Sequence, residues 1–127
     1  MYNAITRSIE QEVVPACRRY GLDIVCYNPI AGGIFSGKYK SHEVPTEGRY
    51  SDAVGAMGGM YRKRYFKDAT WDALRIIEPV VEKNGLTLIE TALRWMVHHS
   101  QLSVLFLSLL LGSLLLTNIQ ERERRWG

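Results

Sequence analysis

The chain has 127 residues, of which 46% are hydrophobic and 23% are charged, and its net charge is +3. This length suits one small domain with a single core. The basic residues form no long block, so we expect no nucleic-acid partner. The two cysteines, Cys17 and Cys26, form neither a metal-binding spacing nor a disulfide framework, which predicts a reducing compartment such as the cytoplasm. The first ten residues have no apolar core, so we expect no signal peptide.

The first predicted helix covers residues 9–20. Ser8 and Gln11 have the spacing of a capping box, and Gly21 is suited to the position just after a helix. Pro15 removes a backbone donor inside this span and should bend the helix. A short apolar run, residues 22–26, follows and predicts a buried strand.

Residues 39–65 show no sustained periodicity and predict a long loop, which in a compact domain is usually functional or disordered. Four basic residues cluster near its end among aromatic side chains: Arg62, Lys63, Arg64 and Lys67. We interpret this cluster as a solvated mixed loop, with a nucleic-acid patch as the less favoured alternative.

Two more helices are predicted, over residues 70–83 and from Thr87 to about His99. Pro79 should kink the first of them or end it early, and Asn84–Gly85 should terminate it. Thr87 and Glu90 form a capping box at the start of the second. His98 and His99 are adjacent and point about 100° apart on a helix, so we interpret them as helix-end residues rather than metal ligands.

Residues 102–117 are almost wholly apolar, and a strongly polar segment follows them. The run is slightly short for a membrane span, which needs roughly 20 residues. Two interpretations stay open: a membrane anchor, and a buried strand followed by the start of a helix.

The apolar run that ends at Cys26 leads into Tyr27 and then into a loop that carries Gly32, Gly33 and Gly37. A strand that opens into a glycine-rich loop is typical of phosphate sites in α/β proteins, because backbone N–H groups converge there. The stretch from Gly32 to Lys38 nearly matches the P-loop pattern. Tyr39 occupies the position of the small hydroxyl that ligates Mg²⁺, so we reject the P-loop and favour a dinucleotide site.

Four collinear motifs make this stretch resemble the aldo-keto reductase family, most closely its aflatoxin-aldehyde reductase subgroup. The first is Tyr27-Asn28-Pro29-Ile30-Ala31-Gly32-Gly33 with Ser36-Gly37-Lys38-Tyr39. The others are Met1-Tyr2-Asn3-Ala4 with Thr6-Arg7, Gly48-Arg49-Tyr50 with Tyr61-Arg62-Lys63-Arg64, and Ala92-Leu93-Arg94-Trp95-Met96 with His98-His99-Ser100. The resemblance covers roughly residues 1–101.

The resemblance implies a (β/α)₈ TIM barrel that reduces aldehydes and ketones with NADPH. Tyr27 would then stack on the nicotinamide, residues 28–38 would wrap the phosphates of NADP(H), and Arg49 would contact the cofactor. The implied cofactor-binding residues are Tyr27, Asn28, Pro29, Ile30, Ala31, Gly32, Gly33, Ile34, Phe35, Ser36, Gly37, Lys38 and Arg49. Tyr61 and Arg64 would face the substrate, where Arg64 could pair with a carboxylate.

The same resemblance implies an α/β fold in the form of an incomplete, C-terminal fragment of that barrel. Residues 1–101 would be a partial NADP-dependent oxidoreductase domain, and residues 102–127 a divergent tail. The family's catalytic Asp, Tyr, Lys and His have no counterparts in these motifs, so we expect no catalytic residues and no activity from this chain alone. The alternatives are a non-catalytic binding or interaction fragment, and a protein tethered to a membrane through residues 102–117.

Overall fold

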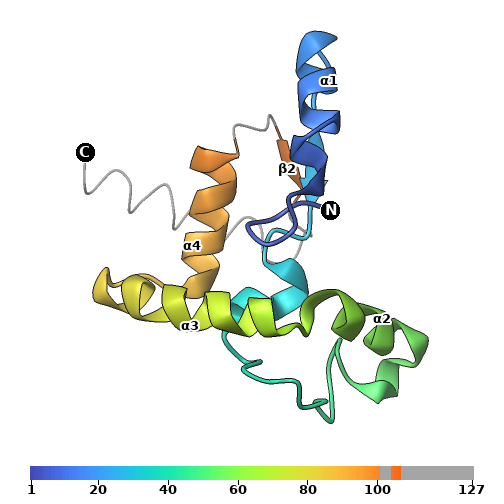
Figure 1. Ribbon diagram of the computed structural model, residues 1–127, viewed down its shortest axis with the longest axis vertical. Helices are drawn as coiled ribbons and strands as arrows, with labels where there is room; N and C mark the ends of the chain where they lie inside the picture. Colours follow the sequence, from blue (N-terminus) through green and yellow to red (C-terminus); the bar gives the residue numbers. More distant parts are fainter. Residues whose placement is uncertain (101–103, 107–127) are drawn as a thin grey trace. The chain divides into compact units, whose positions relative to one another are not determined.

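The computed structural model describes residues 1–100 and 104–106, which divide into two units. The first unit contains residues 1–29 and the described residues from 92 onward, and the second contains residues 30–91. Figure 1 shows the helices and strands along the chain.

In the first unit, the helix α1 (Val13–Arg19) starts later than predicted. A 3₁₀ turn (Ser8–Glu10) precedes it, and no side chain caps its first residues, so the predicted Ser8–Gln11 capping box is wrong. Pro15 is the third residue of α1, where its missing N–H would have no partner within the helix. A start before Val13 would place that missing donor inside the helix, which explains the late start.

Gly21 ends α1 as predicted. Its φ of 64° is left-handed, and the Leu22 N–H donates to the Cys17 carbonyl at 2.8 Å while the Gly21 N–H donates to the Arg18 carbonyl at 3.3 Å. This pair of bonds is the Schellman motif, which satisfies the last carbonyls of a helix. Because Leu22 takes part in it, the strand β1 (Val25–Tyr27) begins three residues later than predicted.

Strand β1 pairs in parallel with β2 (Val104–Phe106), with Val25 opposite Val104 and Tyr27 opposite Phe106. Cys26 is buried and packs with Tyr2 and Met96, whereas its neighbours in β1 are exposed. The strand interpretation of the apolar tail therefore holds for residues 104–106, and the rest of residues 102–117 lies outside the described residues.

The described residues contain this one two-stranded parallel sheet and no closed barrel. The two units are rich in helix, so the implied barrel is visible here only as a helical piece with a single parallel strand pair. No helix in the described ranges is long and apolar enough to cross a membrane.

In the second unit, the helix α2 (Ala56–Tyr65) lies where a loop was predicted, so that prediction is wrong for these residues. Two glycines and scattered apolar residues hide its periodicity. Tertiary contacts stabilise it instead: Arg62 pairs with Asp52 at 2.5 Å and donates to the Tyr50 carbonyl. The basic residues of its last turn also suit the negative end of a helix dipole.

Helix α3 (Asp68–Lys83) confirms the helix predicted over residues 70–83 and begins two residues earlier. Pro79 does not end it early, and the helix continues to Lys83. Buried side chains on both sides of the proline, Leu74 and Val81, hold the two parts of α3 in the core. Gly85 ends α3 with a second Schellman motif, in which the Leu86 N–H donates to the Val81 carbonyl at 3.1 Å.

Helix α4 (Leu88–Arg94) begins in the second unit and continues in the first as a π-helical turn, Trp95–His99. Its predicted capping box is confirmed. The Glu90 N–H donates to the Thr87 hydroxyl at 3.1 Å, and the Thr87 N–H donates to the Glu90 carboxylate at 2.8 Å. His98 and His99 lie at the end of the turn, as predicted.

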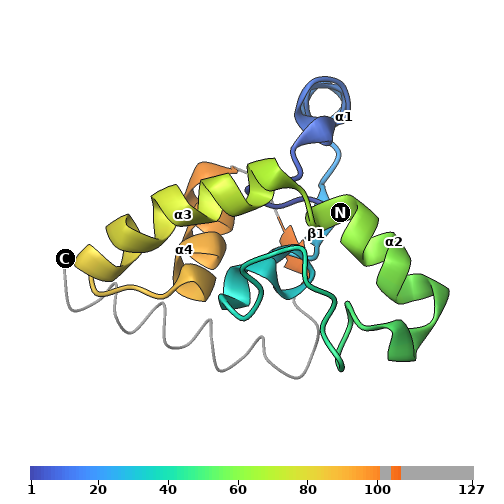
Figure 2. The ribbon, with the colours of Figure 1, turned by 60° about the horizontal axis from the view of Figure 1, so that its bottom comes forward.

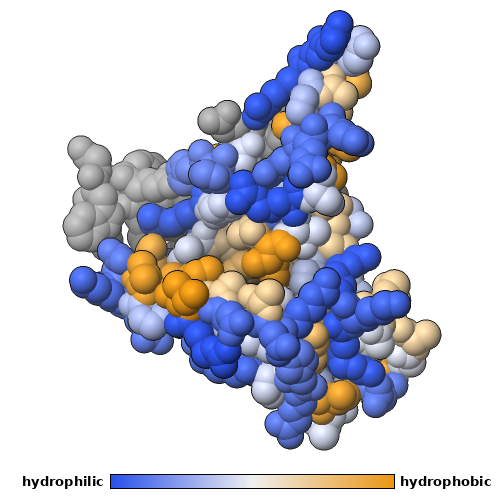
Figure 3. All heavy atoms as spheres, viewed as in Figure 1, coloured by the Kyte–Doolittle hydropathy of each residue, from blue (hydrophilic) through white to orange (hydrophobic). Residues whose placement is uncertain are grey.

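A long loop in the second unit joins the short turns at residues 31–36 to α2, as Figure 2 shows. Hydrophilic residues cover much of the face shown in Figure 3, and hydrophobic residues gather in the region of α3. The core of this unit is largely aromatic. Its buried residues include Ile34, Phe35, Tyr50, Tyr65, Trp71 and Leu74.

Candidate functional site

Tyr27 lies at the end of β1 in the first unit, and 52% of it is exposed. The Tyr2 N–H donates to its carbonyl at 3.2 Å. The side-chain amide of the fully buried Asn3 donates to the next carbonyl, that of Asn28, at 3.0 Å. The Met1–Ala4 motif therefore holds the end of the strand through the backbone and leaves the Tyr27 ring accessible for stacking.

The glycine-rich loop belongs to the second unit, where residues 31–36 form short 3₁₀ turns rather than a regular helix. Four of its residues have positive φ: Ala31 at 52°, Gly32 at 68°, Gly33 at 104° and Gly37 at 73°. Ala31, Ile34 and Phe35 are buried in the core, whereas Lys38 is exposed. The apolar residues of the loop thus anchor it and the polar end remains available to a ligand.

Several of the loop's backbone N–H groups already have partners. The N–H groups of Gly33 and Phe35 donate to the Ile30 carbonyl at 3.0 and 3.3 Å, and that of Gly37 donates to Ile34 at 3.3 Å. The Lys38 N–H donates to the Ser36 hydroxyl at 3.3 Å. These four N–H groups are therefore engaged, and an anion at this loop would depend more on cationic side chains than the glycine pattern alone predicts.

Arg49 supplies such a cation. Its guanidinium lies 5.2 Å from the centre of the Tyr61 ring, a cation–π distance that restricts a side chain otherwise free in solvent. The Tyr61 ring in turn lies against Gly32, since a Cβ added there would be 3.2 Å from the ring. The structure thus brings together three of the residues predicted for the site, although they are separated by up to 29 positions in the sequence (32 to 61).

Arg64, predicted to reach the substrate, is exposed in the last turn of α2, three residues after Tyr61. Residues three apart on a helix are neighbours on its surface. Tyr61 and Arg64 are therefore neighbours on the surface of α2.

Tyr50 was not predicted as a site residue, yet its position ties the loop to the core. It is fully buried, and its hydroxyl donates to the Ala31 carbonyl at 3.0 Å. Burial raises the pKa of this phenol above its ordinary value. Tyr50 belongs to the Gly48-Arg49-Tyr50 motif, but nothing local in the sequence indicated its long-range bond to Ala31.

Gly32 and Gly37 provide a matched test of this packing. Their backbone angles are similar (φ 68° and ψ 11°; φ 73° and ψ 3°). A Cβ at Gly32 would lie 2.8 Å from the Tyr50 hydroxyl oxygen, whereas one at Gly37 would lie 3.6 Å from Leu88. Alanine at either position incurs the left-handed backbone cost of about 1–2 kcal/mol, and Gly32→Ala adds an overpacking cost of about 1–3 kcal/mol.

We therefore expect Gly32→Ala to lower the free energy of unfolding more than Gly37→Ala by at least about 1 kcal/mol. Urea unfolding followed by circular dichroism measures both variants. Equal losses would mean that the Tyr50 and Tyr61 side chains do not pack against Gly32 as described.

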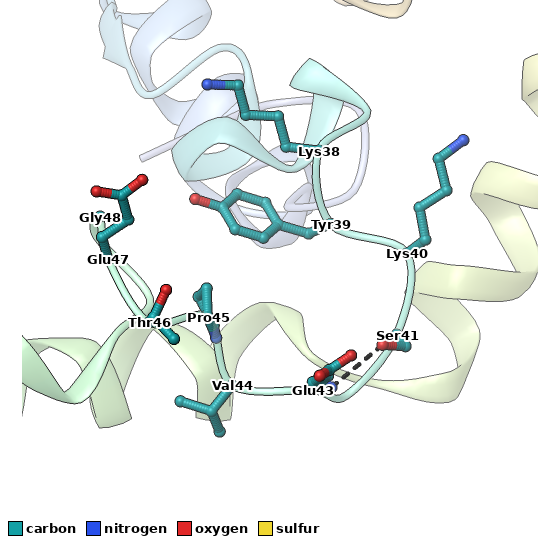
Figure 4. Close-up of a pocket in the computed structure, with 10 residues that line it drawn as sticks. All are labelled: Lys38, Tyr39, Lys40, Ser41, Glu43, Val44, Pro45, Thr46, Glu47 and Gly48. Carbon is teal, nitrogen blue, oxygen red and sulfur yellow. Dashed lines mark hydrogen bonds between the residues drawn. The ribbon is translucent and has the colours of Figure 1, made fainter.

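A groove of about 600 Å³ follows the loop and is lined by residues 38–41 and 43–48. Figure 4 shows the Tyr39 ring directed toward the side of the groove formed by residues 43–48, whereas the ammonium groups of Lys38 and Lys40 point away from these residues. Lys40 pairs with Glu78 at 2.9 Å and His42 with Asp68 at 2.8 Å. These exposed pairs hold the segment to α3 only weakly, since such pairs contribute roughly 0–1 kcal/mol.

Comparison of the amino-acid sequence with known families identifies the class of protein. The sequence model of the aldo/keto reductase family matches residues 1–121. The chain therefore belongs to this family, whose members fold as (β/α)₈ barrels.

Among similar curated proteins, mouse aflatoxin B1 aldehyde reductase member 2 is 39% identical over 111 residues, covering 80% of this chain and 29% of its own length. Human aldo-keto reductase family 7 member A3 is 38% identical over 109 residues, covering 80% of this chain and 32% of its own length. A probable voltage-gated potassium channel subunit beta from Arabidopsis thaliana is 25% identical over 127 residues, 97% of this chain and 36% of its own length. The chain spans about a third of the length of these relatives.

Proposed function

We propose that this chain is the cofactor-binding part of an NADPH-dependent aldo-keto reductase that acts on aldehydes or ketones. Bound NADPH would supply the hydride for carbonyl reduction. The chain's own residues would bind and orient: the exposed Tyr27 ring would stack on the nicotinamide, and residues 28–38 with Arg49 would hold the phosphates. Tyr61 and Arg64 would face the substrate.

The observation that carries this proposal is the contact of Arg49 with Tyr61 at 5.2 Å, beside the left-handed run of the glycine-rich loop. A planar cation fixed on an aromatic ring loses less conformational freedom when it binds an anion than a free side chain does. The residues present fit a phosphate-bearing cofactor through Lys38 and Arg49, both exposed and basic. They fit less well through backbone N–H groups, several of which are engaged.

Carbonyl reduction also needs an acid that protonates the developing alkoxide, and the motifs shared with the family provide none in this chain. We therefore propose that the chain binds NADPH without turning over substrate by itself. A cytoplasmic location accords with its free cysteines, Cys17 and Cys26.

Fluorescence titration of the full chain with NADPH tests the proposal. Saturable enhancement or quenching of the nicotinamide signal is expected, together with no NADPH consumption above buffer when an aldehyde is added. A titration without saturation would overturn the proposal, and measurable turnover would overturn its non-catalytic part.

The second candidate is an interaction fragment that binds a partner protein rather than a cofactor. The relative named as a probable potassium channel subunit beta favours it, because that likeness extends over 97% of this chain. The same titration separates the two candidates, since only the first requires saturable NADPH binding.

If residues 102–117 tether the chain to a membrane, carbonate extraction will leave it in the membrane pellet.

A further inference from the structure

The turn at Ala31–Gly33 is a left-handed run that includes a non-glycine residue. Ala31 has a φ of 52°, and Gly32 and Gly33 follow at 68° and 104°. A left-handed conformation is unfavourable for an L-residue such as alanine. Such a conformation persists where the surrounding structure holds it, so the contacts of the Ala31 backbone indicate what holds this turn.

The side chain that contacts the Ala31 backbone is Tyr50. Its hydroxyl donates to the Ala31 carbonyl at 3.0 Å across 19 positions of sequence. The ring that carries this hydroxyl is fully buried. Three aromatic rings surround it: Phe66, stacked with a centroid distance of 4.9 Å, Tyr39 at 4.7 Å and Tyr61 at 5.9 Å. The hydroxyl is therefore fixed in place before any ligand arrives.

This arrangement leaves different amounts of space beside the two glycines of the turn, Gly32 and Gly33. On the Gly32 side the Tyr50 hydroxyl and the Tyr61 ring leave no room, since an added Cβ would lie 2.8 and 3.2 Å from them. On the Gly33 side an added Cβ would meet only Tyr39, at 3.9 Å. The turn therefore has room for an added atom at Gly33 that it lacks at Gly32.

We propose that Tyr50 is a positioning residue for the cofactor: its hydroxyl holds the Ala31–Gly33 turn closed on the Gly32 side and open to phosphate on the Gly33 side. This inference rests on the proposed function, because it concerns the same loop. Tyr50 itself does not touch the cofactor. It acts through the Ala31 carbonyl, which would otherwise have to find another donor inside the core.

Tyr50→Phe tests the proposal, because it removes the hydroxyl and retains the buried ring. Tyr39→Phe is the matched control: it deletes a hydroxyl in the same cluster, and that hydroxyl makes no hydrogen bond among the described residues. In Tyr50→Phe we expect amide hydrogen exchange of residues 30–38 without ligand to be faster by about five- to tenfold, since a hydrogen bond contributes about 1 kcal/mol. The Kd for NADPH should rise by the same factor. Tyr39→Phe should change neither.

The Kd separates positioning from a general structural role. If Tyr50→Phe merely unfolded part of the sample, the binding stoichiometry would fall while the folded molecules retained the original Kd. Unchanged exchange of the loop, or an unchanged Kd beside a wild-type chain that binds NADPH, would overturn the inference and leave the proposed function intact. If the wild-type chain binds no NADPH, the proposed function falls, and a change in loop exchange alone would reduce Tyr50 to a structural support.

Discussion

Replacing Gly58 with alanine is expected to destabilise the second unit strongly, because an added methyl group meets backbone rather than a side chain. A Cβ at Gly58 would lie 2.1 Å from the carbonyl oxygen of Ser51 and 3.2 Å from Val54. Ser51 is fully buried, and its N–H and hydroxyl both bond to the Gly48 carbonyl at 3.1 and 2.7 Å. The backbone at Ser51 therefore cannot move without breaking these bonds.

We expect Gly58→Ala to lower the free energy of unfolding by about 2–4 kcal/mol, which places it among strongly overpacked variants. Urea unfolding followed by the fluorescence of the buried Trp71 measures this loss in the second unit.

Gly59 is the control for this prediction, because it is the next residue of the same helix. A Cβ there would meet only the flexible end of Arg62, at 3.9 Å. Alanine is favoured over glycine within a helix by roughly 0.5–1 kcal/mol, so Gly59→Ala should raise the free energy of unfolding by about that amount. The free energy of unfolding should therefore fall in Gly58→Ala and rise in Gly59→Ala, although the two glycines are adjacent. If Gly58→Ala also stabilised the chain, α2 would not pack against Ser51.

The second large effect is expected on ligand binding at Arg49. Arg49→Ala removes the cation held over Tyr61, and a hydrogen bond to a charged group contributes about 1.5–3 kcal/mol. The Kd for NADPH should therefore rise by about ten- to a hundredfold. Arg49→Lys should fall between wild type and alanine, because lysine retains the charge but not the planar group that stacks on Tyr61.

Arg75→Ala is the control for loss of charge alone. Arg75 is exposed in α3 and pairs with Asp72 three residues earlier. Its replacement should leave the Kd for NADPH unchanged. NADPH fluorescence titration at fixed ionic strength measures all three variants, since exposed charges are sensitive to salt. Equal effects at Arg49 and Arg75 would indicate non-specific attraction of the cofactor rather than a site at Arg49.

Three of the helix ends were predictable from the sequence. Gly21 and Gly85 were expected to follow helices, and each takes a left-handed conformation in a Schellman motif. The capping box at Thr87 and Glu90 was expected from a spacing of three residues and forms as predicted. Family membership was also predictable, because it rests on collinear motifs.

Helix α2 and the extent of α3 were not predictable in the same way. The α2 sequence has two glycines and no clear apolar stripe, and Arg62 stabilises it through Asp52 and the Tyr50 carbonyl, 10 and 12 positions away. Pro79 was expected to kink α3 or to end it early, yet the helix continues to Lys83 and Leu74 and Val81 are buried on either side of the proline. The packing that overrides the proline involves residues that the local pattern does not reveal.

The sequence by itself determined the family and the helix ends at Gly21, Thr87 and Gly85, because each of these depends on residue types at short, fixed spacings. The tertiary structure alone decided how the loop is held: Tyr50 bonds to Ala31 across 19 positions, and Arg49 lies on the Tyr61 ring that packs against Gly32. Such contacts form only when distant segments are brought together by burial of their aromatic side chains, and no local spacing encodes them.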